Sequence, residues 1–539
     1  IPLRGHKYYD DLSAPKAQNN MNSYFHWTIS NQLSFNRTFG DHSVNAVAVY
    51  EAEKQGIQTS QIVGTGTAGD DKIRTTKGKT IDLTETYNNK YAYTFASWLV
   101  RAQYSYKGRY MVSASIRGDG SSRFAPNTRW GYFPAASVGW RMSDESFLRD
   151  VKWVDDLKIR ASVGQTGNAQ IGNSEYLALY GSTNIDLGNG LTSQVYPTQI
   201  ANNDLGWEKN TQYNVGLDVS LWRGTLGFTA DYYYSKTTDM LFDVPVSSVS
   251  GLTSSNVNIG SMQNKGIELA LTSRRSFGDF SYAFAANWSL NRNKVLSLGD
   301  ENADIIKESS YAGGYYLTRV GQPVGCYYLL VQDGIFHNQE ELDSYPHFDT
   351  TTIGDFRFVD ANGNGILEKD ADRVIVGNYM PDFYYGFSVN LSWKGFDLEI
   401  FLQGAAGNKI YNANRASLEA MSVAQNQMTT VLDRWRGEGT SNSMPRAVFG
   451  DPNKNGRVSN RFIEDGKYLR LKNVTLGYTL PAAWSKKAAM SSVRFFVSGQ
   501  NLLTLTRYTG LDPEISGSGN DNNVYPIARN ITFGASVSF

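Results

Sequence analysis

Residues 382–406 read DFYYGFSVNLSWKGFDLEIFLQGAA, and this stretch decides the fold class. Apolar and small polar residues alternate in it, as in Phe387, Val389, Leu391 and Trp393 against Ser388, Asn390 and Ser392. Because successive side chains of a strand point to opposite faces, this pattern predicts a strand with one apolar and one polar face. Lys394-Gly395 then predicts a two-residue turn into a second strand, so the stretch is an expected antiparallel hairpin.

The same alternation recurs along the chain, for example over 211–221, 282–290 and 531–539. The alternating segments are about 10 to 16 residues long, the length that crosses a bilayer at a tilt. A soluble β-sandwich, the alternative interpretation, normally has short strands with turn signals every 8 to 12 residues. We therefore predict an all-β protein, a transmembrane antiparallel β-barrel whose apolar face meets lipid.

The links between the predicted strands alternate between short and long. The fifteen strands are centred near 22–37, 42–52, 92–106, 109–118, 132–142, 155–164, 210–222, 224–236, 262–274, 278–293, 382–393, 396–406, 466–481, 491–503 and 526–539. The short links are 40–41, 107–108, 223–224, 278–279 and 394–395, with longer ones at 143–154 and 482–490. The long links are 53–91, 119–131, 165–209, 237–261, 294–381, 407–465 and 504–525. Outer-membrane barrels have short periplasmic turns and long extracellular loops.

This parity orients the chain. If the last strand ends in the periplasm, an odd number of strands places residues 1–21 in an extracellular loop. Complete bacterial barrels have an even number of strands and both ends in the periplasm. An open sheet edge in lipid leaves unpaired backbone groups at a cost of several kcal/mol each. We therefore expect the chain to be the C-terminal portion, about fifteen strands, of a larger barrel.

Composition excludes other classes of protein. The chain has 539 residues with 51 basic and 51 acidic side chains, and this zero net charge argues against a nucleic-acid partner. A single cysteine, Cys326, excludes an intramolecular disulfide framework and a cysteine-built zinc site. No nucleophile–base–acid set emerges, so we predict that the protein is not an enzyme. No apolar run approaches 18 residues, which excludes a bundle of transmembrane helices.

One motif in the 294–381 loop resembles half of a calcium loop. Asp360, Asn362 and Asn364 stand at positions 1, 3 and 5, and Gly365 stands at position 6 for the sharp turn. Ile366 would add its backbone carbonyl, and Asp370 or Asp372 would replace the acid missing at position 12, where Ala371 stands. The alternative is an Asx-rich turn without an ion. We expect a structural Ca²⁺ here that rigidifies the loop.

Other polar and aromatic side chains have plainer interpretations. Charges on the polar face are expected to line water or to pair across strands, namely Arg117, Arg160, Asp218, Asp231, Glu268 and Glu399. Loop aromatics such as Trp130 and Trp207 suit either stacking on sugar rings or interface packing. The loop DPNKNG at 451–456 has a lysine between its Asx residues and is interpreted as a turn.

Several stretches carry a resemblance to a known family. The most specific is SASIRGDGSSRF at 113–124, continued by NTRWGYFP at 127–134. Others are LKIRASVGQTGN at 157–168, WEKNT at 207–211, NKGIE at 264–268, YLRLKNVTLGY at 468–478 and GQNL at 499–502. In this order they resemble the SusC/RagA-type TonB-dependent transporters of the Bacteroidetes outer membrane, over nearly the whole chain.

The resemblance implies a barrel of about 22 strands with an N-terminal plug, and on this resemblance we expect the plug domain to be absent from this sequence. It also implies contact with the TonB complex, a SusD-like surface lipoprotein as a lid, and outer-membrane lipids around the barrel. The implied function is TonB-dependent active import of an oligomeric nutrient, an oligosaccharide or a peptide. A passive porin or a surface-adhesion barrel is the alternative.

Overall fold

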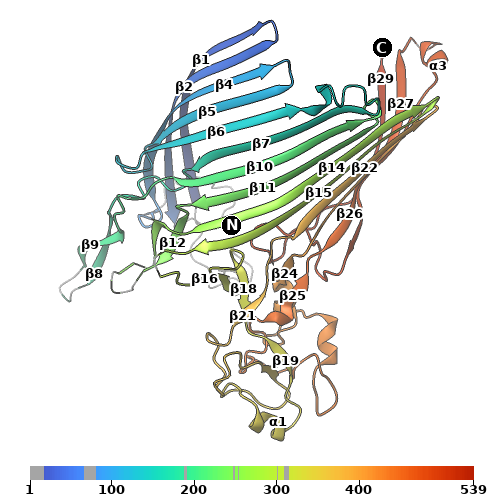
Figure 1. Cartoon of the computed structure of the whole chain (residues 1–539). Helices are drawn as coiled ribbons and strands as arrows, with labels where there is room; N and C mark the ends of the chain where they lie inside the picture. The colour runs from blue at the N-terminus through green and yellow to red at the C-terminus, as the bar shows by residue number, and fades with distance from the viewer. Residues whose placement is uncertain are drawn as a thin grey trace. The chain divides into compact units, whose positions relative to one another are not determined.

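The computed structural model describes residues 17–186, 188, 191–246, 249, 251–252, 254–299, 301–308, 315–487 and 489–539, except for 66–79 (Figure 1). The described chain divides into two compact units. Unit 1 comprises 1–138, 163–211 and 238–259, and unit 2 comprises 139–162, 212–237 and 260–539. The prediction that 1–21 form an extracellular loop segment lies outside the described residues for 1–16, and residues 17–21 belong to the first strand.

Fifteen long strands follow one another in chain order in one sheet, and β3 (Thr80–Ile81) pairs with β2 as the sixteenth. They are β1 (Ala17–Phe39), β2 (His42–Thr65), β4 (Tyr87–Tyr106), β5 (Tyr110–Ser121), β6 (Trp130–Arg141), β7 (Val154–Asn168), β10 (Glu208–Leu221), β11 (Leu226–Thr238), β14 (Ser261–Phe277), β15 (Phe280–Ser297), β22 (Phe383–Trp393), β23 (Phe396–Ala406), β26 (Tyr468–Thr479), β27 (Ser492–Thr506) and β29 (Asn530–Ser538). β1 and β29 are the two ends of this order. All fifteen predicted strands are therefore confirmed.

Antiparallel pairing places the short and long links of each unit at opposite ends of its strands. In unit 2, the turns 278–279 and 394–395 lie at one end, and the links after β15, β23 and β27 lie at the other. In unit 1, the turn after β1 and the turn after β4 share one end in the same way. We call these the short-turn end and the long-loop end. The predicted alternation of the links is confirmed within each unit.

The two faces of the strands differ as the alternation predicts. In β5, the side chains of Tyr110, Val112 and Ile116 are exposed on one face. The face between them carries Ser113, whose hydroxyl hydrogen-bonds that of Ser137 on β6 at 2.7 Å. Apolar side chains exposed in this regular way are expected of a sheet that meets lipid.

The link predicted at 53–91 is shorter than expected. β2 continues to Thr65 and β4 begins at Tyr87, so much of the predicted 53–91 loop is strand. Over 54–61 the sequence is KQGIQTSQ, in which both faces of the strand are mostly polar. The period-two signal fades there because no face is apolar, although the backbone ladder with β1 and β4 continues.

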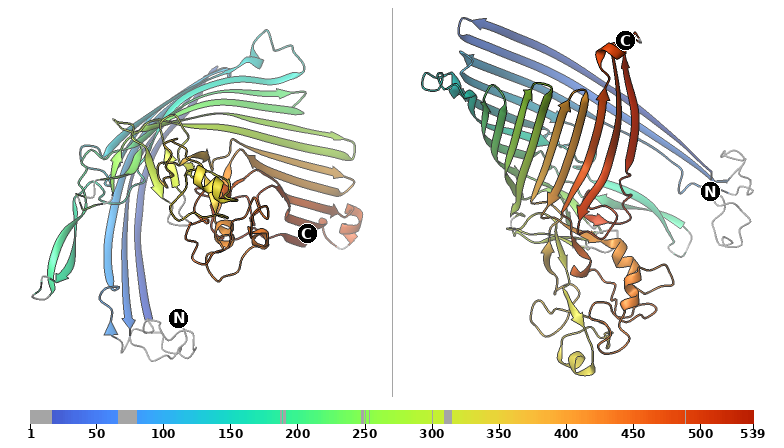
Figure 2. Two further views of the ribbon diagram at one scale, coloured as in Figure 1. Left: turned by 90° about the horizontal axis from the view of Figure 1, so that it is seen from below. Right: turned by 90° about the vertical axis from the view of Figure 1, so that its right-hand side faces the viewer.

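The long links of unit 2 contain short elements that the sequence did not predict. After β15 come β16 (Ile305–Glu308), β17 (Tyr315–Thr318), β18 (Cys326–Leu329), β19 (Gln332–Ile335), α1 (Gln339–Ser344), β20 (Phe356–Phe358) and β21 (Val374–Gly377). After β23 come β24 (Lys409–Asn412), α2 (Ala413–Leu418), η3 (Thr429–Asp433), η4 (Asn460–Phe462) and β25 (Ile463–Asp465), and after β27 comes β28 (Asn520–Asp521). These elements gather at the long-loop end of unit 2 (Figures 1 and 2). We call them together the long-loop lobe.

The links of unit 1 hold two hairpins and a small core. β8 (Leu179–Asp186) pairs with β9 (Leu191–Gln199), and β12 (Leu241–Pro245) pairs with β13 (Ser254–Asn258). Among the described residues, the helices are short, and none has both the length and the apolar character needed to cross a membrane.

Candidate functional site

The polar face of unit 2 holds charges that pair across strands. Arg160 on β7 lies 3.1 Å from Asp218 on β10 and reaches past β10 to Asp231 on β11, at 2.6 Å. Gly216 stands between, and a methyl group at this position would overlap the Arg160 guanidinium and the Asp231 carboxylate. Glycine at 216 therefore lets one arginine join three strands. This confirms the prediction that Arg160, Asp218 and Asp231 pair across strands.

A second arginine reaches across a glycine to an aspartate further along the sheet. Arg494 on β27 reaches across β26 to Asp397 on β23, with its Nε 2.9 Å from the carboxylate. Gly477 on β26 leaves the room, because a methyl group there would overlap both partners. Arg494, Asp397 and the two glycines were not predicted from the sequence. A glycine facing the polar side between two strands with opposite charges is the signal that could have found them.

Uncharged polar groups fill the polar face between these ion pairs. Asn291 accepts from the Tyr233 hydroxyl at 3.1 Å and donates to Asn264 at 3.2 Å. Thr475 and Ser498 hydrogen-bond each other at 2.9 Å. The polar face of unit 2 is thus a hydrogen-bonding wall whose paired charges largely neutralise each other.

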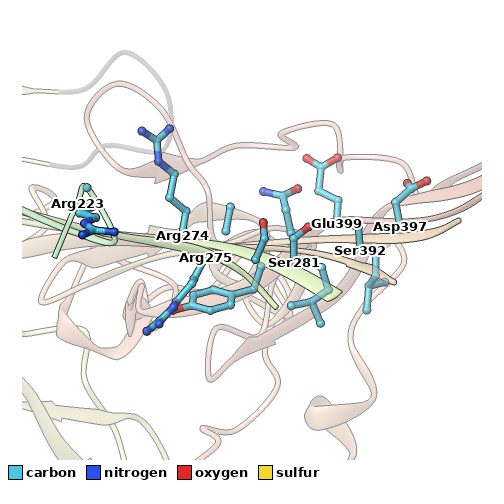
Figure 3. A pocket seen from close by; sticks show the side chains of 14 residues that line it. Arg223, Arg274, Arg275, Ser281, Ser392, Asp397 and Glu399 are labelled. Carbon is cyan, nitrogen blue, oxygen red and sulfur yellow. Dashed lines mark hydrogen bonds between the residues drawn. The ribbon is translucent and has the colours of Figure 1, made fainter. Parts of the chain in front are cut away.

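A pocket of about 490 Å³ opens at the short-turn end of unit 2 (Figure 3). Arg274 stands on the same side of the strands as Asp397 and Glu399, whereas Arg275 points to the opposite side. Among the described residues, Arg274 and Glu399 form no ion pair with each other or with any other side chain. Arg274 and Glu399 are therefore two charges of this wall that remain available to water or to another molecule.

The family-like motifs of unit 1 form a small core at the long-loop end. Phe124, Phe133, Leu205 and Trp207 are buried against one another. The Trp207 indole donates to the Arg129 carbonyl at 2.9 Å, and the Thr128 hydroxyl donates to the Leu205 carbonyl at 2.6 Å. Trp207 is thus a packing residue, whereas Trp130 is 44% exposed and lines a pocket of about 260 Å³ with Asp204 and Lys209.

The long-loop lobe has its own apolar core, which three links of the chain share. Tyr327, Leu329, Tyr411 and Phe462 are buried together. The Tyr327 hydroxyl donates to the Gly519 carbonyl at 2.8 Å, over a separation of 192 residues. Burial raises the pKa of Tyr327 and Tyr411 well above the usual range, so both hydroxyls stay protonated.

Buried ion pairs join the same links at the tip of the lobe. Asp355, which is fully buried, accepts from Arg446 at 2.7 Å and from the Asn455 side chain at 3.0 Å. Arg461 lies 2.9 Å from Glu419. The contacts of Asp355 fasten the link after β15 to the link after β23, whereas the Arg461–Glu419 pair lies within the link after β23. The lobe is therefore one packed body rather than a set of separate loops.

The predicted calcium residues, apart from the buried Asp372, lie at the surface of this lobe. The Asp360 carboxylate accepts from the backbone amides of Gly363 and Gly365 at 2.8 and 2.7 Å. Asn362 accepts from the amide of Asn364, and Asn364 accepts from the amide of Ile366. Gly363 and Gly365 both have positive φ, at 70° and 81°, which permits the tight turn.

The two candidate closing acids differ in position. Asp372 is fully buried and accepts from the amides of Ala361, Asn362 and Glu368, so it closes the loop. Asp370 instead pairs with Arg373 at 2.6 Å. No group of three or more His, Cys, Asp or Glu side chains converges as a metal set in the part of the chain that the structure describes. Calcium binding by Asp360, Asn362, Asn364 and Ile366, with Asp370 or Asp372, stays a prediction.

The DPNKNG loop turns in the same way but uses its side chains differently. Asp451 accepts from the amides of Asn455 and Gly456, as Asp360 does in its own loop. Asn453 and Asn455 are buried, however, and they bind Thr351 and the Phe356 amide. This loop is therefore a turn built into the lobe, while the Asp360 loop keeps its amide oxygens at the surface.

Comparison with known proteins identifies the family. The family model described as TonB dependent receptor-like, beta-barrel, matches residues 4–502. The TonB-dependent receptor P3 of Formosa agariphila is 34% identical over 94% of this chain and 52% of its own length. The TonB-dependent receptor SusC of Bacteroides thetaiotaomicron is 30% identical over 83% of this chain and 44% of its own length. The chain thus spans about half the length of these relatives.

The solved structure of the RagAB peptide transporter shares the fold. It superimposes with a TM-score of 0.82 and 24% identity, over 97% of this chain and 56% of the matched chain. This chain therefore belongs to the β-barrel family of TonB-dependent receptors, is of the SusC/RagA type, and is a protein of the bacterial outer membrane.

Proposed function

We propose that the protein containing this chain imports an oligomeric nutrient, an oligosaccharide or a peptide, across the outer membrane with energy delivered through TonB. The observation that carries this proposal is the polar face of the sheet, which becomes the inner wall when the strands close around a lumen. The names of two similar proteins support it, because SusC is called a TonB-dependent receptor and RagAB is called a peptide transporter.

The wall suits the passage of a hydrated oligomer. Charges such as Arg160, Asp218 and Asp231 pair with one another within the wall. They can therefore exchange hydrogen bonds with a passing solute without binding anions or cations tightly. Amide and hydroxyl groups between them exchange hydrogen bonds with a moving polar chain as readily as with water. The protein forms and breaks no covalent bond in this role.

A SusD-type lipoprotein would cover the long-loop end, which faces the cell exterior by the parity of the links. The long-loop lobe supports this partnership because it is a packed body that offers a fixed surface. Apolar side chains are exposed on it, among them Leu432 at 64% and Phe449 at 81%. Large exposed apolar side chains on a packed surface favour a protein partner.

A passive porin or a surface-adhesion barrel is the alternative function. Energy dependence separates the two, because a porin passes solute down its gradient without TonB. The test measures uptake of labelled oligosaccharides and labelled peptides by cells with and without the gene, each with and without a protonophore. We expect gene-dependent uptake of one class that the protonophore abolishes. Gene-dependent uptake that survives the protonophore would overturn active import.

We also propose that the Asp360 loop binds Ca²⁺ weakly, as extracellular sites with dissociation constants of about 10⁻⁴–10⁻³ M do. Calcium at about 10 mM should then stabilise the lobe by about 1–3 kcal/mol, because it binds only the folded loop. Asp360→Ala should abolish this increment, as measured by hydrogen exchange of 360–372 with and without calcium. Asp451→Ala is the matched control and should leave the increment intact. Hydrogen exchange of the wild-type loop that is the same with and without calcium would contradict the site.

A further inference from the structure

Six aromatic side chains form one continuous row at the short-turn end of unit 2. Strand register pairs each member with the next, on six neighbouring strands: Phe277, Phe280, Trp393, Phe396, Tyr478 and Phe495. The rings of Phe396 and Tyr478 lie 4.5 Å apart, and Phe277 stacks on Tyr282 at 6.4 Å. Register of this kind places all six rings at one height along the strands.

The row lies on the apolar face, where it is open to its surroundings. Phe277, Trp393 and Phe495 are each more than half exposed, at 53%, 55% and 52%. Aromatic rings concentrate at the height of the membrane–water interface, because their apolar bodies enter the hydrocarbon while their edges stay near the headgroups. The row therefore marks the interface on the short-turn side.

Two cations stand over rings of this row. The Arg275 guanidinium lies 4.9 Å from the centre of the Phe277 ring, and the Lys394 amine lies 5.5 Å from that of Trp393. In the described residues, neither cation forms an ion pair, and Asp279 in the same turn pairs with neither. Both positive charges are therefore held at interface height without an anionic partner from the protein.

Unit 1 repeats the arrangement independently. Its short-turn end carries the row Phe39, His42, Tyr106 and Tyr110, paired in register across β1, β2, β4 and β5. Arg37 lies 4.8 Å from the Phe39 ring centre, and Lys107 lies 5.2 Å from that of Tyr106. Lys107 differs from the cations of unit 2 because it also pairs with Asp41 at 3.4 Å. The coupling of a cation to an interface ring is thus a repeated feature of the short turns and not an accident of one hairpin.

We propose that Arg275 and Lys394, held on the aromatic row of unit 2, bind the phosphate groups of phospholipids in the periplasmic leaflet. The rings would pack on the glycerol and upper acyl segments, while each cation meets one phosphate. The parity of the links assigns the short turns to the periplasmic side, where the leaflet is phospholipid. This inference rests on the outer-membrane location and is independent of what the protein transports.

The test is a titration of the full-length protein with phosphatidylglycerol in detergent, read by native mass spectrometry. Arg275→Ala and Lys394→Ala should each weaken phosphatidylglycerol binding roughly fivefold, and the double variant roughly 25-fold. Arg274→Ala is the matched control, because Arg274 is the neighbouring residue on the opposite face of the sheet (Figure 3). It should change binding less than twofold.

Control lipids and a conservative variant test whether the binding depends on the lipid phosphate. Diacylglycerol, which lacks the phosphate, should bind wild type and variants alike, and lipopolysaccharide binding should not change in the variants. Arg275→Lys should keep most of the affinity. Heat-modifiable migration on gels confirms that each variant is folded. Equal losses from Arg274→Ala and Arg275→Ala, or no loss from the double variant, would overturn the proposal.

Discussion

Asp355→Ala is expected to destabilise the tip of the long-loop lobe by about 3 kcal/mol, as when one partner of a buried ion pair is removed. Asp355 is fully buried and accepts from Arg446, the Asn455 side chain and the Thr352 amide. Without the carboxylate, these three donors lose their acceptor inside the lobe. Hydrogen exchange should rise in 351–358 and 444–457, while the strands of the sheet stay protected.

Asp333→Ala is the matched control for this prediction. Asp333 pairs with Arg357 at 3.0 Å, but both side chains are about one-third exposed. An ion pair that water screens in this way contributes less than about 1 kcal/mol. Similar exchange in the two variants would mean that the links of the lobe are not fastened through Asp355.

Val389→Arg is expected to cost about 2–4 kcal/mol of folding free energy in a bilayer, if the new side chain lies near the midplane. Val389 lies on the apolar face of β22, four residues before Trp393 in the interface row, and it pairs in register with Phe284 and Ile400. A guanidinium at this place meets hydrocarbon and can reach neither interface without distortion. Urea titration of folding into lipid vesicles measures the difference.

Ser388→Arg tests the assignment of the two faces. Ser388 is the adjacent residue on the polar face, near Glu399, which forms no ion pair among the described residues. An arginine there meets water and an acid, so its cost should stay below about 1 kcal/mol. Equal penalties for the two variants would show that the apolar and polar faces are misassigned.

Most of the sheet could be predicted from the sequence because lipid on one side and water on the other impose a period of two. The hairpin 383–406 illustrates this, since its second strand was predicted at 396–406 and lies at Phe396–Ala406. The prediction fell short over 53–65, where β2 continues with polar residues on both faces. There the ladder is held by backbone hydrogen bonds, which leave no periodic trace in the sequence.

The candidate site was predicted only in part. Arg160, Asp218 and Asp231 were recognised as charges of the polar face, but their meeting depends on strand order and on Gly216. Asp370 and Asp372 were equal candidates for closing the Asp360 loop. Their partners in the structure differ, because Asp370 pairs with Arg373, while three backbone amides donate hydrogen bonds to Asp372.

The strands, their two faces and the alternation of their links follow from local sequence alone, because each of these is a local response to the surrounding solvent. The long-loop lobe was decided only by the tertiary structure. Its hydrogen bonds connect residues far apart in the chain, such as Asp355 with Arg446 and Tyr327 with Gly519, and no short-range sequence pattern indicates such pairs. What covers the long-loop end is therefore set by packing between loops, which periodicity does not reveal.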